Sequence, residues 1–383
     1  MNQITLIPLN GMEQVALDIQ EYLKGMSETT NCRIMNVELP RFTTGDAKAV
    51  LADSVRGEDV YLLADVGNYS CTYEMFGIEN HLSPDEHFQN LVRTVSAIGG
   101  KAERVNVVMP LLYSARQDKR TKRESLDCAV ALQHLEETGV KNIMTIDVHD
   151  DRVQNAVPFV GFDNLMPTYQ MLKALCRSYD DLIFDEDHMV MVSPDFGGMN
   201  RNFAYANELG LELGVFYKRR NLNVVKNGKN VIEEHKYIGP SVKGKDVFIV
   251  DDMIASGETI LDTVATIKKH GAKRIFVGVS FGFFTNGTGA FEKAYKKGLF
   301  DAIFITNASY VKEEVASAEW YRKVNMTKYI SYYIYCVNEG ISISKILDPH
   351  TKIASLIRKY RAGEALTAPM TTEDTADPKS GQV

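Results

Sequence analysis

The sequence lacks the cysteine pattern of a disulfide-stabilised or zinc-binding protein. Its five cysteines are an odd number and are scattered without any close pair. A disulfide framework or a cysteine-based zinc site requires paired or regularly spaced cysteines, so both are excluded. We expect a reducing cytoplasm as the environment and buried packing as the role of each thiol.

Long hydrophobic runs are also missing. No stretch approaches the roughly 18 apolar residues that a membrane span requires. The first residues, MNQITLIPLNGMEQ, lack the basic and apolar regions of a secretion signal. We therefore expect neither an integral membrane protein nor a secreted one.

The chain has no excess of positive charge. Lys and Arg number 43 and Asp and Glu number 50, which gives a formal net charge of −7. Such a molecule repels phosphate polymers and anionic lipid surfaces, so a general nucleic-acid or membrane role loses support. A small ligand that carries phosphate would have to be bound by local groups.

What the sequence does contain is typical of a folded α/β protein. The 383 residues, 45% of them hydrophobic and 24% charged, suggest two domains. Short β-branched runs with nearly continuous apolar character alternate with amphipathic stretches, which predicts doubly wound domains with mainly parallel sheets. The expected strands are 4–9, 59–66, 104–110, 142–148, 189–193, 246–252, 274–281 and 301–306. The clearest expected helices are 84–98, 125–138, 198–210 and 259–270.

One segment carries most of the predicted chemistry. The run DVFIVDDMIASGETILDTV reads as a strand, a tight loop and a helix. Asp251 and Asp252 would lie at the carboxyl end of the strand, where parallel sheets bind ligands, and two carboxylates suit the hydroxyls of a ribose diol. The loop opens a helix, whose free N–H groups suit a phosphate monoester. The loop residues that would form this ribose 5-phosphate site are Ala255, Ser256, Gly257, Glu258 and Thr259.

This stretch resembles the 5-phosphoribosyl 1-diphosphate (PRPP) binding motif of the type I phosphoribosyltransferase superfamily. In that motif a hydrophobic strand ends in two acidic residues and a loop of small residues. The chain departs from it at Ala255, where many members carry an acid, and at Glu258, where a small residue is common.

Four further segments resemble the ribose-phosphate diphosphokinase (PRPP synthase) family. They are YSARQDKR at 113–120, DVHD at 147–150, SPDFGG at 193–198 and KRR at 218–220. The resemblance runs over about residues 1–360 and implies two phosphoribosyltransferase-like domains, at 1–165 and 166–360. Residues 361–383 have few large apolar side chains, which predicts a flexible tail.

The resemblance also implies roles for individual residues. His149 and Asp195 would bind Mg²⁺, and Asp195 would contact the ribose as well. Arg116 would contact the phosphates of ATP and Gln117 its nucleoside. The match is looser at the adenine loop, where Phe42, Thr44 and Asp46 would bind ATP although the family usually has Asn or Asp at the second position and Glu at the third.

Lys218 and Arg220 would be the catalytic cations, carried by a flap. The segment that follows them, 221–245, is long and polar with Asn-Gly and Lys-Gly turns, as expected of a flap over an active site. The implied reaction transfers the diphosphoryl group of MgATP to ribose 5-phosphate, giving PRPP and AMP for nucleotide biosynthesis. Two alternatives stay open, a phosphoribosyltransferase of nucleobase salvage and a catalytically silent regulatory paralogue. The family resemblance further implies a homo-oligomer, a hexamer built from dimers.

Overall fold

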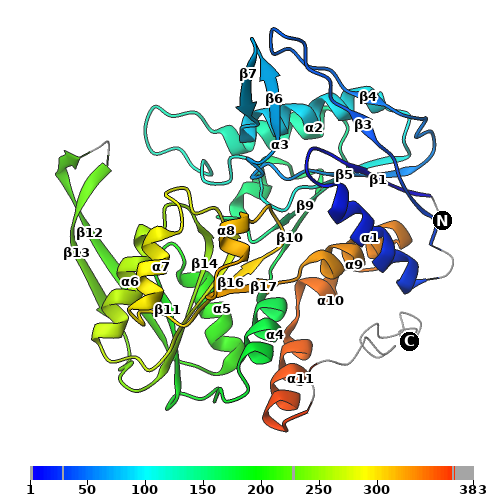
Figure 1. The fold of residues 1–383 in the computed structure, drawn as a ribbon. Coiled ribbons are helices and arrows are strands. Elements are labelled where there is room, and N and C mark those ends of the chain that lie inside the picture. The colour runs from blue at the N-terminus through cyan, green and yellow to red at the C-terminus, as the bar shows by residue number, and fades with distance from the viewer. Residues whose placement is uncertain (1–2, 28–29, 227–228, 365, 367–383) are drawn as a thin grey trace.

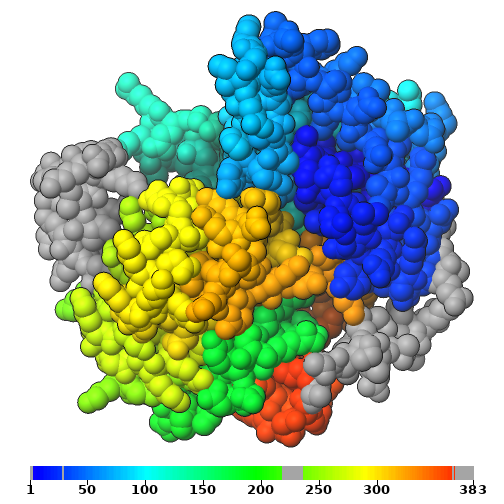
Figure 2. Space-filling model, viewed as in Figure 1, coloured from blue at the N-terminus to red at the C-terminus, as the bar shows by residue number. Residues whose placement is uncertain are grey.

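The computed structural model describes residues 3–27, 30–226, 229–364 and 366, without the side chains of 218–235. Two sheets dominate the molecule, one built from the first half of the chain and one from the second (Figure 1). In the space-filling view the first half, blue to cyan, lies directly against the second half, green to red (Figure 2). No helix among these residues is long and apolar enough to cross a membrane.

The first sheet has six parallel strands in the order β10-β9-β8-β5-β1-β2. Its strands are β1 (Ile4–Pro8), β2 (Cys32–Ile34), β5 (Asp59–Leu63), β8 (Arg104–Val108), β9 (Asn142–Ile146) and β10 (Gly161–Leu165). Alternate side chains of β5 enter different cores. Val60 and Leu62 belong to one apolar cluster, and Tyr61 and Leu63 belong to another. Both faces are therefore covered, which explains the continuous apolar character of these strands.

The second sheet has seven strands in the order β13-β12-β11-β14-β15-β16-β17, all parallel except the β12–β13 pair. They are β11 (Met189–Ser193), β12 (Leu213–Lys226), β13 (Lys229–Ile238), β14 (Asp246–Ile254), β15 (Ile275–Gly282), β16 (Ala302–Thr306) and β17 (Tyr321–Val324). Val247 and Ile249 of β14 face one core and Phe248 and Val250 the other. The prediction of an α/β fold with two mainly parallel sheets is confirmed.

Helices cover both sheets. Those of the first half are α1 (Glu13–Met26), α2 (Pro84–Ile98), α3 (Asp127–Glu137) and the 3₁₀ helix η1 (Asp151–Ala156). Those that follow are α4 (Thr168–Ser178), α5 (Met199–Leu209), α6 (Glu258–Lys269), α7 (Gly289–Lys296), α8 (Glu313–Ala316), α9 (Thr327–Glu339), α10 (Ser344–Leu347) and α11 (His350–Arg361). Helix α2 has the bounds that the sequence predicts, because Ser83 and Glu86 form a reciprocal capping box and Gly99 ends the helix in a left-handed conformation.

Three antiparallel pairs project from this framework. Two are short, β3 (Val37–Glu38) with β4 (Val50–Leu51) and β6 (Thr72–Met75) with β7 (Ile78–His81). The third is the long β12–β13 ribbon, which extends away from the second sheet (Figure 1). Its strands contain residues 221–226 and 229–238 of the segment 221–245 that the sequence predicts to be a flap.

Helix α9 returns from the second half of the chain to the first sheet. The hydroxyl of Tyr333 donates to Asp163 Oδ2 at 2.7 Å, and Asn338 Nδ2 donates to Asp59 Oδ2 at 3.0 Å. Ile330 and Ile334 are buried in the same cluster as residues of β1 and α1. A helix late in the sequence therefore completes the core of the first half.

The end of the chain is only partly described. Arg361 is the last residue of α11 and donates to the carbonyl of Phe184 at 2.8 Å. Arg177 Nη2 donates to the carbonyl of Leu366 at 2.7 Å. Of the segment predicted to be a flexible tail, residues 365 and 367–383 lie outside the described residues.

Candidate active site

The predicted site residues lie where strands from the two halves end. The Asp147-Val148-His149 segment follows β9, and Asp251 and Asp252 lie near the end of β14. His149 Nδ1 is 2.7 Å from Asp252 Oδ2, which joins the two halves. Because Asp252 accepts only, this ring nitrogen carries the hydrogen. The contact was not predicted from the sequence, although both residues were.

The charges of this pair affect one another. The hydrogen bond to Asp252 raises the pKa of His149, against the opposing effect of burial. Burial would raise the pKa of the Asp252 carboxyl, but the hydrogen bond from His149 and the charge of Arg201 together lower it. An imidazolium and a carboxylate are therefore favoured here.

Arg201 on α5 also belongs to the site, although no role was predicted for it from the sequence. Its Nε donates to Asp147 Oδ1 at 2.6 Å, and its Nη1 lies 3.9 Å from Asp251 Oδ1. Only 9% of the Arg201 side chain is exposed. Ser280 on β15 donates to the other oxygen of Asp147 at 2.5 Å. Through Arg201 and Ser280, helix α5 is thus tied to the ends of β9, β14 and β15.

Asp251 and Asp252 differ in their environment. Burial, and next the adjacent charge of Asp252, raise the pKa of Asp251 to about 8. Its side chain keeps 20% of its surface exposed, whereas that of Asp252 keeps 7%. Asp252 is engaged by His149, so Asp251 is the more accessible acid for a ligand hydroxyl.

The predicted phosphate loop joins β14 to the N-terminus of α6. It runs from Ala255 to Gly257 and opens α6 at Glu258. Gly257 has φ +83°, and a Cβ at this position would lie 2.4 Å from the ring of Phe291. Glycine therefore serves both the backbone conformation and the close approach of the ring. The free N–H groups of the first turn of α6 lie at this loop.

Asp195 lies on the loop between β11 and α5. Its Oδ1 accepts from the backbone N–H of Gly198 at 3.1 Å, and its carbonyl accepts from Ser193 at 2.7 Å. These bonds shape the loop at the start of α5, the helix that carries Arg201.

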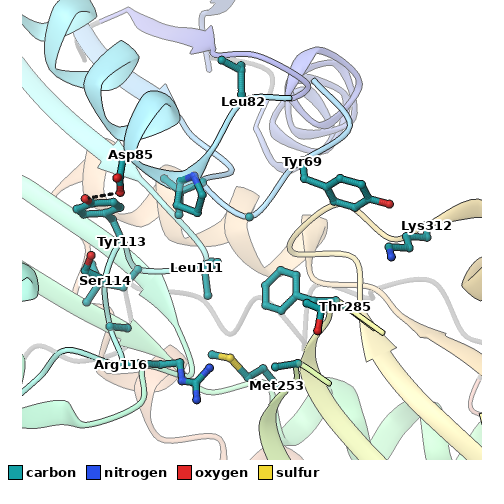
Figure 3. A pocket seen from close by; sticks show the side chains of 17 residues that line it. Tyr69, Leu82, Asp85, Leu111, Tyr113, Ser114, Arg116, Met253, Thr285 and Lys312 are labelled. Carbon is teal, nitrogen blue, oxygen red and sulfur yellow. Dashed lines mark hydrogen bonds between the residues drawn. The ribbon is translucent and has the colours of Figure 1, made fainter. Parts of the chain in front are cut away.

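A pocket of ≈ 660 Å³ lies between the two halves (Figure 3). Arg116 reaches it from the first half, and Met253, Ala255 and Thr285 reach it from the second. Tyr113, also from the first half, lines the pocket on the side opposite Thr285 and donates to Asp85 at 2.8 Å (Figure 3). The predicted nucleotide residue Arg116 and the start of the predicted phosphate loop thus border one cavity.

Other predicted nucleotide residues do not line this pocket. Gln117 Nε2 donates to the carbonyl of Ser125 at 3.0 Å. Phe42 is 56% exposed, and Thr44 donates to Asp46 Oδ2 at 2.9 Å within its own turn. That turn packs on the β6–β7 hairpin, where the N–H of Phe76 donates to the carbonyl of Thr43 at 3.1 Å.

Lys218 and Arg220 lie on β12 at the base of the ribbon, where the backbone pairs Lys218 with His235 and Arg220 with Ile232. Their side chains lie outside what the structure describes. The register of the ribbon shifts between Arg219 and Arg220.

A metal ion would need ligands beyond the protein here. Within the described part of the chain, no group of three or more His, Cys, Asp or Glu side chains is arranged to hold one. Mg²⁺ usually keeps several waters and is bound by one or two carboxylates together with substrate phosphates. His149 and Asp195 stay predicted ligands of such an ion.

Comparisons with known proteins define the class first and then the family. The model of the phosphoribosyl transferase domain matches residues 163–316, so the second half is a domain of this type. The model of the N-terminal domain of ribose phosphate pyrophosphokinase matches residues 4–139. The chain belongs to the ribose-phosphate pyrophosphokinase family, which confirms the resemblance inferred from the sequence motifs.

The similarity to individual relatives extends over most of the chain. The ribose-phosphate pyrophosphokinase of Mycoplasma genitalium is 26% identical over 83% of this chain and 90% of its own length. That of Vibrio cholerae is 26% identical over 86% of this chain and 96% of its own length. The phosphoribosylpyrophosphate synthetase from Mycobacterium smegmatis shares the fold, with a TM-score of 0.71 and 21% identity over 88% of this chain and 99% of that one.

Proposed function

We propose that this chain is a ribose-phosphate pyrophosphokinase that converts MgATP and ribose 5-phosphate into PRPP and AMP. The observation that carries the proposal is the pocket between the halves. It is bordered by Arg116 from the predicted nucleotide segment and by Ala255 from the predicted ribose-phosphate loop. Two substrates bound to these segments would meet there, as a transfer between them requires.

The reaction needs little covalent chemistry from the protein. The anomeric oxygen of ribose 5-phosphate forms a bond to the β-phosphorus of ATP and loses its proton. The bond from that phosphorus to the oxygen of the α-phosphate breaks, and AMP leaves. Catalysis of such a transfer rests on positioning and on stabilising negative charge.

The chain's own residues supply these two contributions. The first turn of α6 would hold the 5-phosphate, and Asp251 would accept from a ribose hydroxyl. Asp252 orients His149 through their hydrogen bond of 2.7 Å. Arg116, Lys218 and Arg220 would offset the charge that develops on the phosphates. Mg²⁺, bound through His149, Asp195 and the phosphates, would contribute further charge neutralisation.

The adenine loop supports an assembly of several copies. Phe42 is 56% exposed, and neither it, Thr44 nor Asp46 lines the pocket that Arg116 borders. This loop could contact a nucleotide that lies beside Arg116 of another copy. Such a contact would require the active protein to be a homo-oligomer. We propose dimers assembled into a hexamer, acting in the cytoplasm.

An assay with ribose 5-phosphate and ATP, with products identified by mass, tests the function. We expect PRPP and AMP in equal amounts. ADP as the sole nucleotide product would contradict the proposal. Release of pyrophosphate from PRPP and a free nucleobase would establish the phosphoribosyltransferase alternative, and binding of both substrates without turnover would establish the silent paralogue.

A further inference from the structure

The β6–β7 hairpin lies against the adenine loop, which is part of the segment that joins β3 to β4. The N–H of Phe76, at the tip of the hairpin, donates to the carbonyl of Thr43 in the loop at 3.1 Å. Hairpin and segment lie side by side at the top of Figure 1. Among the described residues, none from either of them lines the pocket between the halves. Within one copy, the hairpin would therefore affect a bound nucleotide only through the loop.

The adenine loop is a tight turn closed by its own backbone. The N–H of Phe42 donates to the carbonyl of Asp46, and the N–H of Gly45 donates to the carbonyl of Phe42, both at 2.8 Å. Gly45 has φ +95°, and a Cβ at this position would lie 2.6 Å from Met75 Sδ of β6. Phe42 and Asp46 are exposed. The turn thus presents these two side chains to solvent, while Met75 packs against it at Gly45.

Arg41 connects this turn to two other elements. Its Nη1 donates to the carbonyl of Gly45 at 3.1 Å and lies 3.2 Å from Glu86 Oε1 of α2. Its guanidinium carbon lies 3.9 Å from the ring centroid of Tyr73 on β6. Only 10% of the Arg41 side chain is exposed. One largely buried cation therefore holds the turn, the hairpin and the start of α2 together.

The carboxylate that faces Arg41 is itself held in place. Glu86 and Ser83 form the reciprocal capping box of α2. Burial would raise the pKa of Glu86, but hydrogen bonds from the Ser83 N–H and from Tyr73, together with the charge of Arg41, lower it. Glu86 is therefore a carboxylate with a fixed position, and it anchors Arg41 to the first turn of a helix.

This arrangement is not the most stable way to fill the space. Arg41 Nη2 is buried and has no hydrogen-bond partner among the described residues. A buried donor without a partner costs free energy, and well-packed apolar side chains often replace a buried ion pair without loss of stability. An apolar side chain would not bond the Gly45 carbonyl, however. What the guanidinium provides is a defined position of the turn.

We propose that Arg41 and the β6–β7 hairpin position the adenine loop and thereby set the affinity for ATP. Arg41 and Tyr73 are positioning residues: they act through the loop and do not touch the nucleotide. This inference rests on the proposed function, because the binding of ATP by the loop is part of that function. If the loop adopts its binding conformation only part of the time, the apparent affinity for ATP falls by the same fraction.

Calorimetry on the full chain tests the proposal, with MgATP and ribose 5-phosphate titrated separately so that no turnover occurs. Tyr73→Leu removes the ring face against Arg41 and should weaken ATP roughly fivefold, the scale of one cation–π contact. Ribose 5-phosphate should bind as in the parent. Tyr73→Phe keeps the ring face and should restore most of the affinity for ATP.

A second substitution changes the cation instead of the ring. Arg41→Lys keeps the charge, but a single ammonium lacks the planar fork that stacks on Tyr73 while bonding two oxygens, so ATP should again bind more weakly. Arg274→Lys is the matched control. The Arg274 guanidinium also bonds Asp246 and lies 5.6 Å from a tyrosine ring centroid, but at the amino ends of β14 and β15. This variant should lose stability and keep the affinity for ATP.

A double-mutant cycle tests whether the hairpin acts through the loop. Phe42→Ala removes an exposed side chain of the loop and should weaken ATP by itself. Tyr73→Leu added to Phe42→Ala should then weaken ATP little further, because both changes affect the same contact with the nucleotide. Fully additive losses would overturn the proposal, since they would mean that the hairpin and the loop act independently.

The outcomes separate this inference from the proposed function. Lower melting temperatures with unchanged ATP affinity in Tyr73→Leu and Arg41→Lys would overturn the inference and leave the cluster a purely structural role. Equal weakening of both substrates, or weaker ATP binding by Arg274→Lys, would overturn it as well. If Phe42→Ala weakens ATP while these variants do not, only the inference fails. If Phe42→Ala also leaves ATP unaffected, the proposed role of the adenine loop fails with it.

Discussion

His149 and Asp252 are 103 residues apart in the sequence, and their side chains meet at 2.7 Å. One belongs to the first half of the molecule and the other to the second. The contact fixes the end of β9 relative to the end of β14. The geometry of the site therefore depends on how the two halves are held together.

We expect the His149–Asp252 pair to show a large coupling energy in a double-mutant cycle. The cycle compares the unfolding free energies of the parent, His149→Ala, Asp252→Asn and the double variant, measured with denaturant at about pH 6.5. We expect a coupling of about 1–3 kcal/mol, since one partner is buried and the bond is charge-assisted. The exposed pair His188–Asp185, at 2.6 Å, is the control and should give a much smaller coupling, because solvent screens its charges. Equal couplings would show that burial does not strengthen the contact.

The sequence was sufficient to predict the framework. All eight strands expected from apolar runs are present, and 189–193 has the bounds that were predicted. These strands are covered on both faces, so their apolar residues form unbroken runs. Such runs can be recognised in the sequence without knowing which strands and helices pack against them. Motifs at strand ends could be placed for the same reason, because parallel strands end at the same edge of a sheet.

The contacts within the site could not be predicted in this way. Arg201 is one charged residue of an amphipathic helix, and no local pattern shows that it reaches Asp147. The return of α9 to the first sheet depends on contacts with residues far away in the sequence. The β6–β7 hairpin, which holds the Phe42 turn, was also missed. Its short strands, TYEM and IENH, contain too few apolar residues to predict a strand.

The Asp251 carboxyl should make the stability of the protein depend on pH. Its pKa is raised from 3.8 to about 8, so in this window the folded state retains a proton that the unfolded chain has lost. Its contribution to stability therefore falls as the pH rises from about 4 to about 8. Asp251→Asn cannot ionise, and its melting temperature relative to the parent should increase across this window. Asp262→Asn, at an exposed position on α6, is the control and should show no such trend.

The same substitution should impair substrate binding. Asp251→Asn replaces one carboxyl oxygen, a possible acceptor, with an NH₂ group that cannot accept, so ribose 5-phosphate should bind more weakly while ATP is affected less. Asp252→Asn should behave similarly, with an added effect through His149. Dissociation constants for each substrate measure this. An equal loss for both substrates would assign the acid pair to a metal instead of the sugar.

Removal of the chain end should have a graded effect. A chain that ends at Leu366 should keep the melting temperature of the parent, because 367–383 has little apolar content. A chain that ends at Tyr360 loses the hydrogen bonds of Arg361 to Phe184 and of Arg177 to Leu366. Loss of these two hydrogen bonds, at about 1 kcal/mol each, should lower the melting temperature by a few degrees. Calorimetric scans of the three chains would show whether the tail begins after 366 or, as the sequence suggested, at 361.

The base of the β12–β13 ribbon should contribute to the rate. Lys218→Ala should lower kcat by roughly 10² to 10³ with little change in substrate dissociation constants, as when one donor to developing charge is removed. Arg220→Ala should behave alike, and the double variant should lose less than the product of the two single effects. Arg219→Ala should be mild. A damaging Arg219→Ala with silent neighbours would mean that the assigned roles are shifted by one residue.

The final prediction concerns the phosphate loop. Gly257→Ala should destabilise the protein and weaken ribose 5-phosphate, because φ is +83° and the new Cβ would meet the Phe291 ring at 2.4 Å. Gly244→Ala provides the matched control. Gly244 has φ +75° with nothing within 4 Å of its Cβ position, so its substitution should cost only the backbone strain of about 1–2 kcal/mol.

The difference between the two variants isolates the contact with Phe291. Unfolding free energies should show Gly257→Ala as the more destabilising, since the buried ring must move. Only Gly257→Ala should raise the dissociation constant of ribose 5-phosphate, because displacement of the loop moves the N–H groups at the start of α6 away from the phosphate. If the two variants lost the same stability and Gly257→Ala bound ribose 5-phosphate normally, the phosphate would have to bind elsewhere than at this loop.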